Sequence, residues 1–307
     1  MTAAFLTILP IFATIMLGWG ATQYRFVEEK TGESVSDYVF VIAIPLLMFR
    51  TLATSKLPDL QPWPYWLSYF IALAVVWIIA TSVTRRAFAR DATESVIVGF
   101  SSAQANTVLI GIPLLARVFG DLALVPLVLL LAVHTPITIT AATLMVEKAG
   151  PGTNRSAVIF QKLIKNPLIL GIAAGSIFRL SGFPMPDPAL AFLKLVGDSA
   201  APCALFAMGA ALTRYGLGGE PRLLAVIVFL KLIAFPSGVY LLATWVFPVP
   251  PAWVAVGTLL AACPCGVNAY LLAQRYNIGV GLTSGAIAAS TVLSVVTLTF
   301  WVWLVSG

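Results

Sequence analysis

Two short polar clusters, each containing a proline and an asparagine, interrupt long apolar stretches of the chain. One consists of Asn106, Thr107, Gly111 and Pro113, and the other of Pro264, Cys265, Gly266 and Asn268. A proline inside a helix removes a backbone hydrogen bond and clashes with the preceding turn, so each cluster is expected to be unwound. The free N–H groups at the start of a half-helix favour an anion, and an asparagine side chain offers a donor and an acceptor. The clusters therefore predict a binding site for a small anion, with no catalytic residue.

Three ionisable side chains in apolar stretches are candidates for charge pairing or for coupling to an ion. His134, the only histidine, can titrate near neutral pH and couple to protons, or it can stay uncharged and bond a neighbouring helix. Lys231 can pair with an anionic ligand, neutralise a carboxylate or extend its charge to the membrane surface. Asp198 is interpreted as a helix cap, with an ion or proton site as the alternative.

The spacing of Cys263 and Cys265 around Pro264 invites a metal or redox interpretation. Two thiolates without a partnering histidine or further cysteines do not complete a zinc site. The third cysteine, Cys203, also lies in an apolar run. We therefore expect no metal and no cofactor.

The elements that hold these residues must be membrane-spanning helices. Of the 307 residues, 60% are hydrophobic and only 10% are charged, whereas soluble domains carry about 25% charged residues. This composition excludes a soluble enzyme and a nucleic-acid-binding protein. In lipid, every backbone polar group needs a partner within the protein, so apolar runs of about 20 residues form spanning helices.

Charge-free runs and the proline cluster at 248–251 divide the chain into ten expected spans. Their ranges are about 3–23, 35–53, 62–84, 93–118, 121–146, 166–182, 190–213, 222–247, 252–275 and 280–304.

The Lys and Arg residues distribute unequally over alternate loops. Twelve of the 18 fall on one side, namely Arg25, Lys30, Arg85, Arg86, Arg90, Lys148, Arg155, Lys162, Lys165, Arg214, Arg222 and Arg275. Because positive loops face the cytoplasm, both termini are expected on the outer side of the plasma (inner) membrane. The net charge of +6 is therefore explained by the basic cytoplasmic loops, which set the orientation of the protein in the membrane, and does not indicate a polyanionic partner.

Ten spans with a basic central connection at 148–165 divide into two five-helix repeats, residues 1–147 and 166–307. An odd number of spans per half inserts the second half upside down, which makes an inverted repeat. The two polar clusters then occupy equivalent places, in spans four and nine. Two interrupted spans in matching positions are typical of the binding site of a transporter.

Several motifs resemble those of a known family of carriers. They are Asn106 with 111–115 and 119–120, 165–167 at the start of span six, 201–212 in span seven, and Pro264 with 268–269. In order and spacing they resemble the auxin efflux carrier family, whose prokaryotic members include malonate and malate permease-like proteins.

The resemblance implies an all-α, elevator-type carrier with two crossing, broken helices. The scaffold would comprise about 1–56 and 166–213, and the transport core about 60–147 and 222–307. Asn106, Pro113, Pro264 and Asn268 would lie at the crossover and receive the substrate carboxylate.

We therefore expect a secondary transporter of malonate, malate or an auxin-like acid, acting by alternating access. Its partners would be the small carboxylate and the lipid bilayer, with a homodimer through the scaffold helices as an option and no nucleic acid. The first alternative is a sodium-coupled symporter with a related fold, as in bile-acid carriers, using Asp198 and polar groups near the crossover. Scarce acidic residues there count against it. A channel and an intramembrane enzyme using His134 with Ser101 or Cys263 are more remote alternatives.

Overall fold

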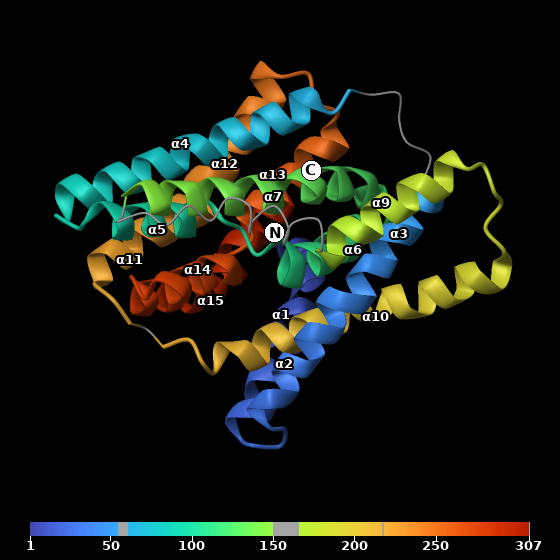
Figure 1. The fold of residues 1–307 in the computed structure, drawn as a ribbon, viewed down its shortest axis with the longest axis horizontal. Coiled ribbons are helices and arrows are strands. Elements are labelled where there is room, and N and C mark those ends of the chain that lie inside the picture. The colour runs from blue at the N-terminus through green and yellow to red at the C-terminus, as the bar shows by residue number, and fades with distance from the viewer. Residues whose placement is uncertain (55–60, 150–165, 217, 307) are drawn as a thin grey trace.

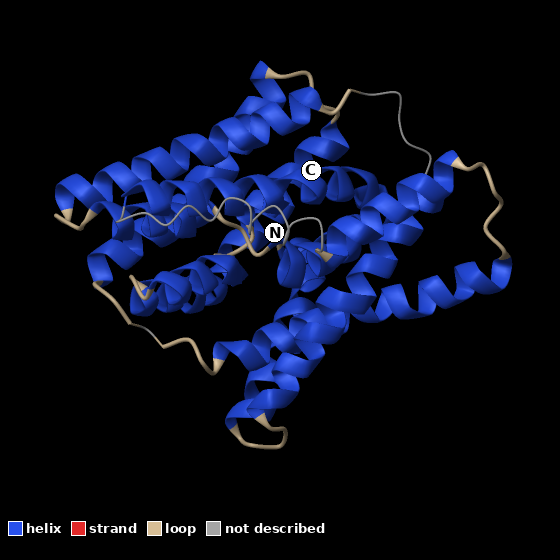
Figure 2. Ribbon diagram, in the orientation of Figure 1, coloured by secondary structure: helices blue, strands red, loops and turns tan. Residues whose placement is uncertain are grey.

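The computed structural model of the protein describes residues 1–54, 61–149, 166–216 and 218–306. Within these ranges the regular elements are all helices, joined by loops, and the single β-bridge joins Ala105 to Cys265 (Figure 2). The helices are α1 Thr2–Gln23, α2 Glu29–Tyr38, α3 Ile44–Thr54, α4 Trp63–Ala87, α5 Ala92–Ala103, α6 Ile112–Phe119, α7 Leu124–Ala149, α9 Pro167–Leu180, α10 Asp187–Leu212, α11 Pro221–Phe229, α12 Phe235–Leu241, α13 Pro251–Ala262, α14 Val267–Tyr276 and α15 Val280–Ser306. Wider π-helical turns at Val39–Ala43, Thr107–Gly111, Leu230–Ala234 and Leu242–Val246 continue some of them, and a 3₁₀ turn at Gly120–Ala123 precedes α7.

Seven helical segments of the described chain are long and apolar enough to cross a membrane. One of them, Thr107–Ala149, contains the second half of predicted span four together with span five. Predicted spans six and nine correspond to shorter apolar helices, Pro167–Leu180 and Pro251–Ala262. The protein is therefore an integral membrane protein, as its composition predicted, although the count of ten crossings is not confirmed.

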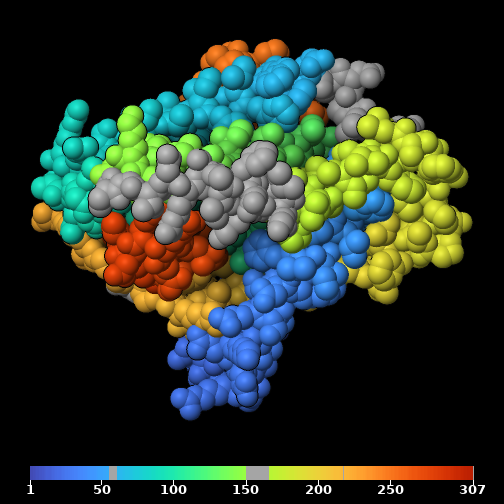
Figure 3. All heavy atoms as spheres, viewed as in Figure 1, coloured from blue at the N-terminus to red at the C-terminus, as the bar shows by residue number. Residues whose placement is uncertain are grey.

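One group of packed helices contains α1, α2, α3, α9 and α10, on the lower and right sides of Figure 1. Its main contacts are α1 against α10 and α3 against α9. Glycines allow these close approaches: a Cβ at Gly209 would overlap the carbonyl of Ile15, and one at Gly171 would lie 2.4 Å from that of Pro45. The connection between α1 and α2 projects from the body of the molecule (Figure 3).

The second group contains α4, α5, α7 and α11 to α15. Here α4 packs on α5 and α5 on α7, while α12 packs on α13 and α13 on α15. The two polar clusters lie in this group, between α5 and α6 and between α13 and α14. Apolar residues buried in both groups form one continuous core.

Candidate functional site

The two interrupted spans meet at their breaks. Helix α5 ends at Ala103 and α13 ends at Ala262, and Ala105 then pairs with Cys265 as an antiparallel bridge. The Asn106 N–H donates to the Pro264 carbonyl, and the Gly266 N–H donates to the Gln104 carbonyl, both at 2.8 Å. Each break thus supplies partners for backbone groups that the other has freed, which is how unwound chain is tolerated at membrane depth.

The break in span four lies upstream of the position that its proline suggested. Gln104 has an extended backbone, whereas Pro113 lies in the first turn of α6. The π-helical turn Thr107–Gly111 runs directly into α6, so Pro113 lies inside a continuous helical segment and removes one backbone hydrogen bond without ending it. Span four is therefore unwound near its centre, as predicted, but at Gln104–Asn106 and not at the proline itself.

Asn106 holds the start of the second half of this span. Its Oδ1 accepts a hydrogen bond from the Leu109 N–H at 3.2 Å, and its Nδ2 lies 3.2 Å from the sulfur of Met208 on α10. The side chain is 5% exposed. Asn106 therefore caps a π-helical turn that also contains Thr107 and Gly111, and it joins the break to a helix of the other group.

Asn268 occupies the matching place after the second break but makes different contacts. It lies in the first turn of α14 and is half-buried, and its side chain forms no hydrogen bond within the described chain. Of the N–H groups of that first turn, that of Ala269 donates to the Gly266 carbonyl at 3.0 Å, whereas those of Val267 and Asn268 precede the first helical hydrogen bond. The amide of Asn268 is therefore free to bind a ligand.

Three residues at the bridge between the two breaks were not predicted as site residues from the sequence. Ser290 on α15 accepts a hydrogen bond from the Cys265 N–H at 3.0 Å. Gln104 is buried, and its Oε1 has no partner in the described chain. Ala105 carries no polar side chain, so no residue-type signal marks it.

Gly266 permits the two breaks to touch. A Cβ on this residue would lie 2.8 Å from the Ala105 carbonyl oxygen and 3.1 Å from its carbon. We therefore expect Gly266→Ala to force the bridge apart and to destabilise the protein by about 1–3 kcal/mol. Thermal unfolding of the purified protein measures this, and Gly197→Ala is the control because its Cβ would make only ordinary contact, at 3.5 Å from Leu47. Equal unfolding temperatures for the two variants would contradict the expectation.

Lys231 is fully buried beside the second break and does not extend to the membrane surface. Its Nζ donates to the carbonyl of Ala261, in the last turn of α13, and lies 4.9 Å from the centre of the Phe235 ring. No carboxylate of the described chain forms an ion pair with it. The side-chain nitrogen of Lys231 is thus placed at the C-terminal end of a half-helix, where the helix dipole favours a positive charge.

His134 and Asp198 lie in different surroundings. His134 is fully buried against the Tyr69 ring, with centroids 5.5 Å apart, and neither ring nitrogen has a hydrogen-bond partner in the described chain. Asp198 lies in the middle of α10, so its interpretation as a cap was wrong; it pairs with Lys194 at 2.7 Å and Arg50 at 3.2 Å.

A polar cavity of about 480 Å³ extends toward the breaks. It lies between α2 and α10 on one side and α14 on the other, and it reaches Leu109 and Val267. At its mouth Arg214 donates to Glu29 and Glu33. Partial burial lowers the pKa of Arg214, but these hydrogen bonds outweigh it and raise the pKa above its ordinary value. A larger cavity between α4 and α7 is apolar and lies away from the breaks.

The sequence matches the family described as "Membrane transport protein" over residues 3–302. A protein of Rhizobium meliloti (strain 1021) named "Putative malonate transporter" is 28% identical over 309 residues, covering 97% of this chain and 94% of the relative. A protein of Methanothermobacter thermautotrophicus (strain Delta H) named "Uncharacterized transporter" is 23% identical, covering 96% of each chain. The chain therefore belongs to this family of membrane transport proteins, the auxin efflux carrier family that its motifs resemble.

Proposed function

We propose that the protein is a secondary transporter of a small organic anion, of which malonate and malate are the leading examples. The observation that carries the proposal is the pairing of two unwound segments at Ala105 and Cys265, close to a buried lysine. The substrate carboxylate binds beside this bridge, where Asn268 and the first N–H groups of α14 donate to it. The malonate relative supports this substrate class.

Electrostatics favour an anion over a cation at this place. Lys231 brings a positive charge to the end of α13, and no acidic side chain in the described chain neutralises it. The His/Cys/Asp/Glu side chains of the described chain form no group of three that fits a metal ion. A substrate carboxylate supplies the missing negative charge, and because Lys231 is already buried, only the carboxylate loses water when it binds.

The cavity lined by α2, α10 and α14 gives the substrate access from one side. Its mouth carries Arg214, Glu29 and Glu33, and its inner end reaches Val267, next to Asn268. Arg25 follows the C-terminal end of α1, and Arg214 follows the C-terminal end of α10. By the positive-inside rule these basic residues lie on the cytoplasmic side, so the mouth that contains Arg214 faces the cytoplasm. Both chain termini then lie on the outer side of the plasma membrane.

The helix packing supports ten crossings arranged as an inverted repeat of residues 1–147 and 166–307. In such a repeat, α1 of the first half corresponds to α9 of the second, and α3 corresponds to α10. The contact between α1 and α10 therefore corresponds to the contact between α9 and α3. In the same way, the contact between α5 and α7 corresponds to the contact between α13 and α15. Both members of each pair are present, as a two-fold axis in the membrane plane requires.

We assign α1–α3, α9 and α10 to a scaffold and the remaining helices to a transport core that moves against it. The most extensive contacts, α1 with α10, α3 with α9 and α4 with α5, run within the sets, whereas α6 and α15 of the core also pack on α1 of the scaffold. Asn106 in the core touches Met208 in the scaffold, so movement of the core must break this contact. Such movement exposes the bridge to each side of the membrane in turn, which is the elevator form of alternating access.

Ligand-induced stabilisation of the purified protein tests the proposed function. A ligand that binds the folded state stabilises it by about 2.7 kcal/mol when present at about 100 times its Kd. We expect malonate or malate to raise the unfolding temperature equally with sodium and with potassium as the added cation. A shift that requires sodium would instead indicate a symporter, and no shift with any mono- or dicarboxylate would contradict the anion site.

A further inference from the structure

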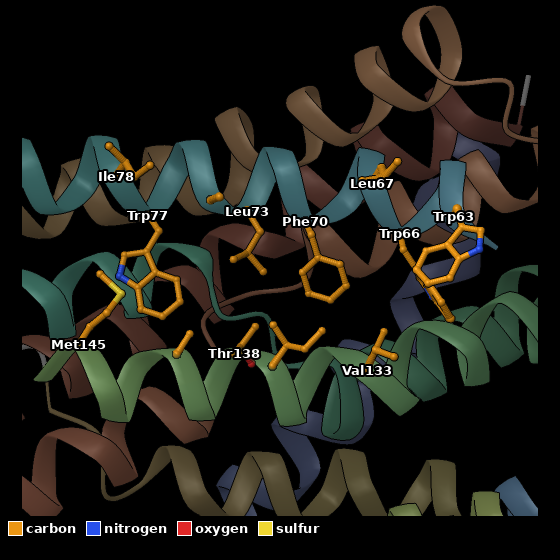
Figure 4. Close-up of a pocket in the computed structure, with 13 residues that line it drawn as sticks. Trp63, Trp66, Leu67, Phe70, Leu73, Trp77, Ile78, Val133, Thr138 and Met145 are labelled. Atoms are coloured by element: carbon orange, nitrogen blue, oxygen red, sulfur yellow. The ribbon is translucent and has the colours of Figure 1, made fainter. Parts of the chain in front are cut away.

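A groove with a volume larger than that of the cavity near the breaks lies on the outside of the transport core, between α4 and α7. Figure 4 shows its floor and walls, which include Trp63, Trp66, Phe70 and Trp77 from α4 and Met145 from α7. Its volume is about 750 Å³, within the range of small-molecule sites. Its lining is almost entirely apolar, and the hydroxyl of Thr138 is already bonded to the His134 carbonyl at 2.7 Å. The groove therefore suits a hydrocarbon chain rather than the polar substrate.

Contacts behind the groove hold its aromatic walls in place. Trp66 donates its indole N–H to the Leu129 carbonyl at 3.1 Å, and its ring packs edge-on against Trp63 with centroids 5.2 Å apart. Trp77 packs against Phe100 on α5, with centroids 5.4 Å apart. Because these side chains are fixed before anything binds, a ligand need not order them, which lowers the entropic cost of binding.

The dimensions of the groove match a lipid chain. From Trp63 to Ile78 the lining extends along α4 for about 22 Å at about 1.5 Å per residue. One leaflet of hydrocarbon is about 15 Å thick, half of the full bilayer core. The groove therefore accepts the whole acyl chain of a phospholipid.

Positive charge gathers at one end of the groove. Helices α4 and α7 run in the same direction (Figure 4), so their C-terminal ends lie on the same side of the membrane. These ends carry Arg85, Arg86 and Lys148, all exposed. None of the three forms an ion pair within the part of the chain that the structure describes. Three unpaired cations beside an apolar groove complement a negatively charged headgroup on a hydrocarbon chain.

We propose that this groove is a binding site for one anionic phospholipid. An acyl chain lies between α4 and α7, and the headgroup phosphate binds the cations Arg85, Arg86 and Lys148. The site is separate from the anion site at the helix breaks, and its occupant comes from the bilayer rather than from solution.

Native mass spectrometry of the full chain in detergent tests this proposal. The probes are phosphatidylglycerol and phosphatidylcholine with identical acyl chains, each added at equal concentration. We expect one phosphatidylglycerol to be retained about tenfold more than phosphatidylcholine. The variant with Arg85→Gln, Arg86→Gln and Lys148→Gln is expected to lose this preference. The control Arg25→Gln with Lys30→Gln removes two exposed cations of the α1–α2 region and should keep it.

Variants that fill the groove test the acyl-chain part separately. Ala74 lines the groove, whereas its neighbour Val75 is 48% exposed on the same helix and does not. Ala74→Trp should abolish retention of both lipids, and Val75→Trp should retain them as the wild type does. If Ala74→Trp fails to fold, Ala141→Trp fills the groove from α7. Equal retention of the two lipids by the wild type, or lipid binding that survives a folded groove-filling variant, would overturn the proposal.

Discussion

Replacement of Lys231 by Met is expected to make the empty protein more stable and to weaken its response to an anionic ligand. The lysine is fully buried and forms no ion pair in the described chain. Burial of an ion costs several kcal/mol, whereas the Ala261 carbonyl left without its donor costs about 1–3 kcal/mol. The net change in the free energy of unfolding is therefore positive, by about 1 kcal/mol or more.

The same substitution should weaken anion binding strongly. A carboxylate about 8 Å from the ammonium gains about 2 kcal/mol at an effective dielectric constant of about 20, which corresponds to about 30-fold in Kd. Thermal unfolding with and without malonate measures both effects on one sample. Lys194→Met is the control, because Lys194 is an exposed partner of Asp198 on α10. A less stable Lys231→Met protein that still responds fully to malonate would show that the lysine serves only the fold.

The sequence predicted the interrupted spans because their cause is local. Proline, glycine and asparagine within long apolar runs lower the stability of a continuous helix wherever the chain goes next. The pairing of Ala105 with Cys265 has no such signal, since a backbone bridge depends on two segments that are distant in the chain. Pro113 shows the limit of local reasoning, because the helix resumes at Thr107 and continues through this proline, whereas the break lies upstream at Gln104.

The sequence shows which charged side chains lie within apolar stretches, but it does not predict their surroundings in the fold. Lys231 lies nine residues from Arg222, a spacing that fits either an interfacial or a buried lysine. Its burial depends on α13, which supplies the acceptor carbonyl from another part of the chain. Asp198 likewise forms an ion pair with a residue of another helix, Arg50 on α3. Helical periodicity gives the face on which a residue lies, but tertiary packing decides which helix covers that face.

The two asparagines of the helix breaks should respond differently to substitution by alanine. Asn106 caps the turn at Thr107–Gly111 through Leu109, so Asn106→Ala is expected to cost about 1 kcal/mol of stability in addition to weakened binding. Asn268 has no partner in the described chain, so Asn268→Ala should leave the stability of the empty protein unchanged. A hydrogen bond to a carboxylate contributes about 1.5–3 kcal/mol, which predicts at least about tenfold weaker malonate binding for Asn268→Ala.

Asn268→Asp is the matched control for this comparison, because it keeps the size of the side chain and replaces its donor by a negative charge. If Asn268 donates to the substrate carboxylate, the aspartate variant must bind malonate more weakly than Asn268→Ala, since it adds repulsion to the lost hydrogen bond. Isothermal titration with malonate on the purified proteins gives the order of the three affinities. Stronger binding by Asn268→Asp than by Asn268→Ala would mean that this position contacts a cation, and the assignment of α14 to the anion site would then be wrong.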